Sequence, residues 1–207
     1  MSVVETIALA ATIVTVISFI SGLSICLNIY RKGSTLDFSA IPFIAGVLCC
    51  TLWLRYGYML SDETMIFVNT IGLSLQVLYL IWFYAFTGKR GPLNRQIGYL
   101  LVILASVSIV VESRSDPTYL AGLLACMASL LCCSAPLVGV GEVLRTKSSE
   151  KLPFVLIASS FVVSLMWLLY GLVINDQFVS VTNGIAVLIS TVQLSLFVIY
   201  PTKAKTQ

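Results

Sequence analysis

Seven long apolar runs divide this sequence and constrain its fold more than any other feature does. They cover approximately residues 6–27, 38–60, 64–86, 97–111, 118–140, 152–174 and 178–200. A helix needs roughly 20 apolar residues to cross the hydrocarbon core of a bilayer, and it satisfies its own backbone hydrogen bonds there. The sequence therefore predicts an all-α polytopic membrane protein with seven transmembrane helices, of which the fourth, ending before Glu112, is the shortest.

The overall composition excludes a soluble globular domain. Hydrophobic residues make up 58% of the chain, charged residues 10%, and the mean hydropathy is +1.00, whereas soluble domains are about half apolar and about a quarter charged. The connections between the runs are short, so we expect the lipid bilayer to surround a single membrane domain. The first run follows no basic segment and exceeds the roughly 7–15 apolar residues of a signal peptide, which indicates that it is retained as a span.

Basic residues gather on one side of the predicted spans. Ten of the twelve lysines and arginines fall there: Arg31, Lys32, Lys89, Arg90, Arg95, Arg145, Lys147, Lys151, Lys203 and Lys205. Cytoplasmic loops of membrane proteins carry such an excess, so we expect the N-terminus outside and the C-terminus in the cytosol. The same rule accounts for the net charge of +3 without any nucleic-acid partner.

The reactive residue types indicate neither a metal site nor an enzyme. All six cysteines lie inside predicted spans, where we interpret them as small packing residues, and the chain has no histidine. A zinc site built from cysteine and histidine is therefore excluded, and we expect no cofactor or other metal ion. The sequence also lacks a nucleophile–base pair and a phosphate-binding loop, so we do not expect an enzyme.

The sequence repeats itself. Trp53-Leu54-Arg55-Tyr56-Gly57 ends the second run, and Trp167-Leu168-Leu169-Tyr170-Gly171 ends the sixth. An asparagine follows each tryptophan by 16 residues, Asn69 in one half and Asn183 in the other, so both residue types recur 114 residues apart. The Pro-Phe pairs that begin at Pro42 and Pro153 recur after 111 residues, which predicts about three extra residues in one helix.

Two three-helix units and a linker account for this repeat. Three helices cross the membrane an odd number of times, so a second copy keeps the orientation of the first only if one further helix separates them. We therefore expect a first triple-helix bundle at residues 1–90, a linker helix at 91–116, and a second triple-helix bundle with a short cytosolic tail at 117–207.

These motifs resemble the SWEET sugar transporters, most closely their animal branch. The likeness is carried by the Pro-Phe, Trp-Leu-x-Tyr-Gly and Asn elements of each half and by Ser-Ala-Pro-Leu at residues 134–137. It implies a facilitative, bidirectional uniporter of mono- or disaccharides that works by alternating access without ion coupling. It also implies a multi-pass protein of the plasma membrane, with the Golgi membrane left open, that assembles as a homo-oligomer.

The resemblance implies a central sugar pocket lined by residues of both halves. The candidate residues are Asn69, Asn183, Trp53 and Trp167, to which we add Cys49, four residues before the first tryptophan. Amides offer donors and an acceptor to sugar hydroxyls, and indole offers a flat apolar face and one donor. Two alternatives stay open: the amides can join helices to one another, and the tryptophans can anchor the protein at the membrane interface.

The resemblance also implies hinges near the cytosolic ends of four helices. Three prolines match the family pattern, Pro42, Pro136 and Pro153, while Gly22 stands where the family has a fourth. Prolines are also tolerated in spans as kinks without function. Arg55 near the outer end of the second run is expected to reach the interface, or to form a gate with one of the outer carboxylates Asp62, Glu63 and Asp176.

Absent charges argue for uniport and against two other classes of membrane protein. Coupled carriers usually keep a titratable group at depth, but here the nearest, Glu142, lies close to the cytosolic end of its run. A carrier of the proline-glutamine loop type would have a Pro-Gln pair, which this sequence lacks, and a seven-span receptor would not have an internal repeat. A transporter of another small metabolite and a non-transporting membrane adaptor on the same scaffold remain as alternatives.

Overall fold

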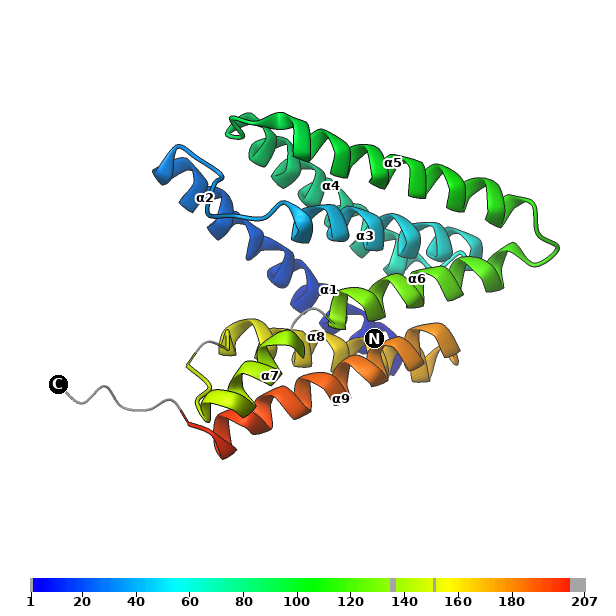
Figure 1. The fold of residues 1–207 in the computed structure, drawn as a ribbon. Helices are drawn as coiled ribbons and strands as arrows, with labels where there is room; N and C mark the ends of the chain where they lie inside the picture. Colours follow the sequence, from blue (N-terminus) through cyan, green and yellow to red (C-terminus); the bar gives the residue numbers. More distant parts are fainter. Residues whose placement is uncertain (1, 135–136, 151, 202–207) are drawn as a thin grey trace. The chain divides into compact units, whose positions relative to one another are not determined.

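The computed structural model describes residues 2–134, 137–150 and 152–201. Every regular element in these ranges is an α-helix (Figure 1). The helices are α1 (Val3–Ile20), α2 (Gly22–Lys32), α3 (Ile41–Leu60), α4 (Glu63–Ala85), α5 (Arg90–Glu112), α6 (Pro117–Ser134), α7 (Leu137–Thr146), α8 (Phe154–Val173) and α9 (Gln177–Ile199). The predicted all-α fold is confirmed.

The helices agree with the predicted spans, with differences in length at the fourth and the fifth. Six segments are long and apolar enough to cross a bilayer, among them Val3–Lys32, which joins α1 and α2, and a shorter apolar helix covers Pro117–Cys133. The fourth span, predicted as the shortest, is the 23-residue helix α5. Its first turns carry polar residues such as Arg90, Asn94 and Gln96, which extend the helix without adding to the apolar run.

Residues Thr15–Ala128 form one compact unit. Helices α3 and α4 pack along each other as an antiparallel hairpin, α2 packs on α4, and α5 packs on α3. The buried core of this unit includes Ile29, Phe43, Tyr79 and Phe83. The ring of Phe43 lies 5.6 Å from that of Tyr79 and 6.2 Å from that of Phe83, which is the usual spacing of packed aromatic rings.

The second unit comprises Met1–Val14 and Ser129–Gln207. Helices α8 and α9 form its antiparallel hairpin, and α7 packs on α9. Its buried core includes Val143, Leu152, Ile157 and Leu196. Val143 is fully buried, as is Ile29, which stands 114 residues earlier in the other unit.

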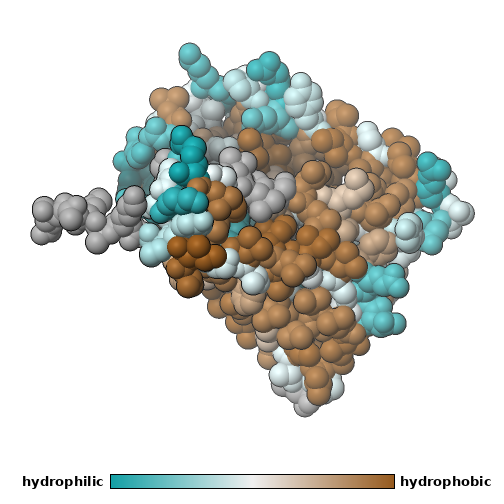
Figure 2. Space-filling view, turned by 60° about the horizontal axis from the view of Figure 1, so that its bottom comes forward, coloured by the Kyte–Doolittle hydropathy of each residue, from teal (hydrophilic) through white to brown (hydrophobic). Residues whose placement is uncertain are grey.

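Large apolar side chains cover much of the molecular surface. Exposed examples occur along the helices of both units, including Ile109 in the first and Val155 and Val198 in the second. Figure 2 shows apolar residues over most of the visible face and hydrophilic residues gathered toward its margins. Exposed apolar surface on this scale is unfavourable in water and favourable against lipid chains, so the protein is a multi-pass membrane protein.

The two hairpins repeat at a spacing of 114 residues in their backbone as well. Helices α3 and α8 each have 20 residues, and α4 and α9 each have 23. Non-glycine residues with positive φ close both hairpins, Ser61 at 56° and Asn175 at 58°. The expectation of about three extra residues in one helix is therefore wrong. The prolines recur after 111 residues because Pro42 is the second residue of α3, whereas Pro153 precedes α8 as its N-cap.

Candidate functional site

A capping aspartate starts the asparagine-bearing helix of each hairpin. The Asp62 carboxylate accepts a hydrogen bond from the Met65 backbone N–H at 2.8 Å, and the Asp176 carboxylate accepts one from the Val179 backbone N–H at 2.8 Å. Each bond satisfies one of the free N–H groups of a helix N-terminus. These aspartates fix where α4 and α9 begin, and hence the turn on which each asparagine lies.

A glycine in each hairpin lets the two helices come close together. A Cβ placed at Gly57 would lie 3.0 Å from the Met65 Cβ, and one placed at Gly171 would lie 2.8 Å from the Ser180 backbone nitrogen. The Gly57 carbonyl oxygen accepts the Asp62 N–H at 3.0 Å, as the Gly171 oxygen accepts that of Asp176 at 2.8 Å. The repeated Tyr-Gly motif thus serves the tight closure of the hairpin.

Asn69 and Asn183 adopt the same arrangement in their separate units. The Asn69 Nδ2 donates to the Met65 carbonyl oxygen at 2.9 Å, and the Asn183 Nδ2 donates to the Val179 carbonyl oxygen at 2.8 Å. Both side chains are partly buried. Within the described ranges, neither amide makes a bond to another helix, so the interpretation as interhelical contacts gains no support there.

Each asparagine amide keeps hydrogen-bonding capacity for a ligand. An amide has two N–H donors and an oxygen that can accept. One N–H of each is used inside its own helix, and the remaining N–H and the Oδ1 have no partner among the described residues. Each half of the chain therefore offers one oriented donor and one acceptor without carrying a charge.

The two tryptophans also have matching surroundings. The Trp53 ring lies 5.8 Å from that of Tyr56 at an interplanar angle of 71°, and the Trp167 ring lies 5.5 Å from that of Tyr170 at 89°. Both tyrosines are buried. Trp167 is only 9% exposed, which is unlike an indole anchored among lipid headgroups. Trp53 is partly buried.

Cys49 lies one helical turn before Trp53 and shares its neighbours. Both pack against a buried cluster formed by Leu52, Ala125 and Ala128, which joins α3 to α6. The cysteines form no disulfide in the described part of the chain, and no group of three or more potential metal ligands occurs there. Cys49 therefore lies beside a candidate site residue, and its part in sugar binding stays a prediction.

The candidate binding residues fall into two sets. Cys49, Trp53 and Asn69 lie on α3 and α4 of one unit, and Trp167 and Asn183 lie on α8 and α9 of the other. Each set is built in the same way from a tryptophan at the end of one hairpin helix and an asparagine on the next. That the two sets share one sugar pocket stays a prediction.

The described hinge candidates lie at helix starts. Gly22 begins α2 directly after the break at Ser21, and Pro42 and Pro153 lie at the starts of α3 and α8. Pro136 lies outside the described residues. Proline in a first turn or at an N-cap breaks no helical hydrogen bond, so these two prolines do not kink a helix. A hinge at either one would bend the junction between loop and helix, and the hinge roles stay predictions.

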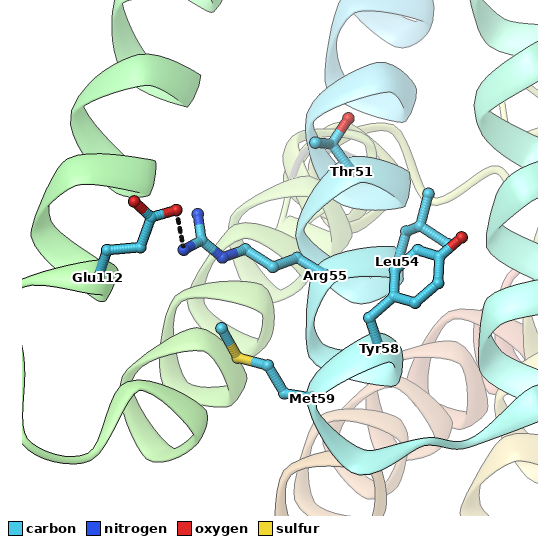
Figure 3. A pocket seen from close by; sticks show the side chains of 6 residues that line it. All are labelled: Thr51, Leu54, Arg55, Tyr58, Met59 and Glu112. Carbon is cyan, nitrogen blue, oxygen red and sulfur yellow. Dashed lines mark hydrogen bonds and ion pairs between the residues drawn. The ribbon is translucent and has the colours of Figure 1, made fainter.

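Arg55 pairs with a residue of α5 and not with the carboxylates we expected. Its guanidinium lies 3.2 Å from the Glu112 carboxylate of α5 and donates to the Ser108 carbonyl oxygen at 3.5 Å. Figure 3 shows Arg55 reaching from α3 across a shallow hollow of about 560 Å³ toward Glu112. Asp62 and Asp176 serve as helix caps. The expected gate between Arg55 and Asp62, Glu63 or Asp176 is therefore not found among the described residues.

The capping aspartates are functional residues that our sequence reasoning missed. From the sequence we interpret Asp62 and Asp176 only as outer carboxylates and possible gate partners of Arg55, and not as helix caps. The signal was present, because both stand immediately before an apolar run, which is typical of an N-cap, and both recur at the spacing of 114 residues.

The fold and the site define a multi-pass helical membrane protein whose halves carry the same tryptophan, asparagine and capping aspartate. The MtN3/saliva family model, described as "sugar efflux transporter for intercellular exchange", matches residues 5–91 and again residues 119–205. These two matches begin and end 114 residues apart, the spacing of the tryptophans and asparagines. The chain belongs to this family, the SWEET transporters.

Individual relatives and a solved structure agree with this assignment. The chain is 39% identical to "Sugar transporter SWEET1" of Drosophila pseudoobscura pseudoobscura over 97% of this chain and 91% of that protein. It is 35% identical to "Bidirectional sugar transporter SWEET2" of Arabidopsis thaliana over 88% of this chain and 80% of that protein. A solved eukaryotic SWEET transporter matches with a TM-score of 0.84 and 26% identity over 95% of this chain and 96% of that chain. The resemblance found in the sequence is confirmed, and the family is one of transporters and not of enzymes.

Proposed function

We propose that the protein is a facilitative, bidirectional sugar uniporter that works by alternating access. The observation that carries this proposal is the pair of equivalent asparagine amides, Asn69 and Asn183, each oriented by a bond to its own helix. The relatives support the choice of cargo, because they are named as sugar transporters.

The chemistry of the site suits a neutral polyhydroxylated ligand. A sugar presents hydroxyl groups around a ring with apolar C–H faces. The donor and acceptor left on each asparagine can bind hydroxyls, and the faces of Trp53 and Trp167 can cover the ring. Neutral hydrogen bonds contribute only about 0.5–1.5 kcal/mol each, so the cargo can leave as readily as it enters.

Transport without ion coupling is part of the proposal. A coupled carrier needs a titratable or ion-binding group whose state changes during transport. Two ion pairs hold charged residues near helix ends: Arg55 with Glu112 at 3.2 Å, and Arg145 with Glu142 at 3.1 Å. These pairs support a carrier driven by the sugar gradient alone.

The proposal also includes the orientation of the protein in the membrane, its cellular location and its oligomeric state. Arg145 and Lys147 lie at the end of α7 and just after it, and Arg31 and Lys32 end α2. The positive-inside rule places these ends in the cytosol, with the N-terminus outside. We place the protein in the plasma membrane, with the Golgi membrane as the alternative, and expect a homo-oligomer.

Uptake into proteoliposomes tests the proposal. The purified protein is reconstituted without ion gradients, and the entry of radiolabelled D-glucose and sucrose is followed against protein-free liposomes. We expect uptake of at least one sugar that stops when the internal and external concentrations are equal, and exchange that continues in both directions. A non-transporting adaptor would give the rate of protein-free liposomes for both sugars.

A further inference from the structure

A pocket lined in part by polar side chains lies inside the second unit, away from the tryptophan and asparagine ends of its helices. It has a volume of about 240 Å³ and is enclosed by α6, α8 and α9. Polar side chains from all three helices line it: Cys132 and Cys133 from α6, Ser160 from α8, and Ser190 and Gln193 from α9. Gln193 lies ten residues after Asn183, about 15 Å further along the same helix.

The amide and the two serine hydroxyls of this pocket make no hydrogen bonds to other described residues. Gln193 is 3% exposed, and its Nε2 is buried without a hydrogen-bond partner in the described part of the chain. Ser190 is 3% exposed, and neither its hydroxyl nor that of Ser160 bonds to another described residue. Leaving such groups unsatisfied is unfavourable. A bound molecule with hydroxyl groups would satisfy them.

The first unit fills the corresponding space with its own side chains. Tyr79 stands 114 residues before Gln193, and Phe19 stands 114 residues before Cys133. The Tyr79 hydroxyl donates to the Phe19 carbonyl oxygen at 3.2 Å, and the Phe19 ring occupies the space that a Cβ on Gly72 would enter. The second unit has shorter side chains at both positions. The pocket is therefore a specific departure from the repeat.

The lining selects a neutral ligand of limited size. It combines an amide and two hydroxyls with apolar walls such as Ile157 and Ile189, and the residues that line it carry no charge. Its volume corresponds to about eight water molecules at about 30 Å³ each and lies below the roughly 300 Å³ at which pockets for drug-sized ligands begin. A single sugar ring or a polyol of that size fits this description better than an ion or a disaccharide does.

We propose that this pocket is a second subsite for one sugar ring, located in the second half only, on the side of Asn183 toward the basic end of the bundle. The proposal rests on the proposed function, because the cargo supplies the ligand. The subsite would make the two halves unequal: a sugar ring would meet an amide and two hydroxyls in one half and aromatic packing at the equivalent place in the other.

Thiol protection tests the subsite directly, because Cys132 and Cys133 line it. The full protein in nanodiscs is treated with N-ethylmaleimide with and without D-glucose, and alkylation of each cysteine is followed by mass spectrometry. Cys26 and Cys50 of the first unit serve as internal references. We expect D-glucose to slow alkylation of Cys132 and Cys133 severalfold, in the wild type and in Asn69→Ala, and to leave the references unchanged.

Two variants remove the polar lining without enlarging the residue. Gln193→Met and Ser190→Ala should each abolish this protection, whereas Tyr79→Phe, the matched change in the first unit, should keep it. The subsite is overturned if D-glucose protects neither cysteine, as expected for a pocket that holds only water, or if protection survives both lining variants. Loss of the protection in Asn69→Ala would also overturn the subsite. The protection would then result from closure of the protein around a sugar at the central site. Sugar flux of the wild type, measured separately, decides the proposed function.

Discussion

Asn69 and Asn183 hold their side-chain amides in the same way, each donating to the carbonyl oxygen four residues earlier in its own helix, at 2.9 Å and 2.8 Å. Each of these carbonyls belongs to the residue whose backbone N–H binds the capping aspartate of that helix. Cap, carbonyl and amide therefore form one short chain of contacts in each half. The repeat preserves an orientation of the amide and not only its position in the sequence.

The capping aspartates should act through their hydrogen bonds and not through their charge. Replacing Asp62 or Asp176 by alanine removes the cap and should lower the free energy of unfolding by about 0.5–2 kcal/mol. Asparagine is an equally good cap, so Asp62→Asn and Asp176→Asn should restore most of the stability. Thermal unfolding in detergent measures both effects. Asparagine variants that unfold at temperatures as low as those of the alanine variants would show that the carboxylate charge, and not the hydrogen bond, stabilises the helix start.

The hairpin glycines should differ in their tolerance of a methyl group. In Gly171→Ala the new Cβ would meet the Ser180 backbone nitrogen at 2.8 Å, and in Gly57→Ala the nearest atom is the Met65 Cβ at 3.0 Å. Since a Cβ at Gly171 would also lie 2.8 Å from the Ser180 Oγ and 2.9 Å from a Val179 methyl carbon, whereas the next contact at Gly57 is at 3.3 Å, Gly171→Ala should destabilise the protein more, by about 1–3 kcal/mol. Gly184→Ala is the matched control, because its nearest neighbour lies at 3.7 Å. Equal unfolding temperatures for Gly171→Ala and Gly184→Ala would contradict this reading of the hairpin.

Much of the fold could be predicted from the sequence because both of its signals are one-dimensional. Apolar runs mark spans by length alone, and the recurrence of Trp53 and Asn69 after 114 residues marks the two halves. The prediction failed where a residue depends on its neighbours in space. The pairing of Arg55 with Glu112 joins α3 to α5, and no periodicity connects residues on those two helices.

The sequence also did not predict the local geometry at the helix starts and around Gln193. The proline spacing suggested a longer helix, while the structure places Pro42 inside a first turn and Pro153 before one. The pocket beside Gln193 exists because side chains on α6 and α9 are shorter than their counterparts in the first half. Such a pocket can be recognised only from the packing of the helices and not from the sequence.

The prolines at the helix starts should affect the rate of transport more than the binding of sugar. Pro42→Ala and Pro153→Ala free the backbone at the junctions of α3 and α8 with their preceding loops. We expect a severalfold lower exchange rate with an unchanged dissociation constant for D-glucose. Parallel loss of binding and exchange would show that these prolines support the site and not the conformational change.

If the protein is a uniporter, sugar flux should not depend on proton or sodium gradients. Initial D-glucose uptake into vesicles should be the same with and without imposed proton or sodium gradients, and a protonophore should leave it unchanged. The measurement compares initial rates at equal sugar concentration. A severalfold fall after adding the protonophore would refute uniport while leaving sugar transport itself intact.

The most direct test of the account is sugar flux in Asn69→Ala and Asn183→Ala proteoliposomes. Each variant loses one amide, whose two ligand bonds contribute about 0.5–1.5 kcal/mol each, so flux at low sugar concentration should fall by about fivefold to a hundredfold. Thr70→Ala and Thr191→Ala are the matched controls, since each exposed hydroxyl also donates to the carbonyl four residues earlier in its own helix, at 2.7 Å. The account predicts flux at least about fivefold lower in both asparagine variants and wild-type flux in both threonine variants, at equal amounts of reconstituted protein. Wild-type flux in both asparagine variants would contradict it.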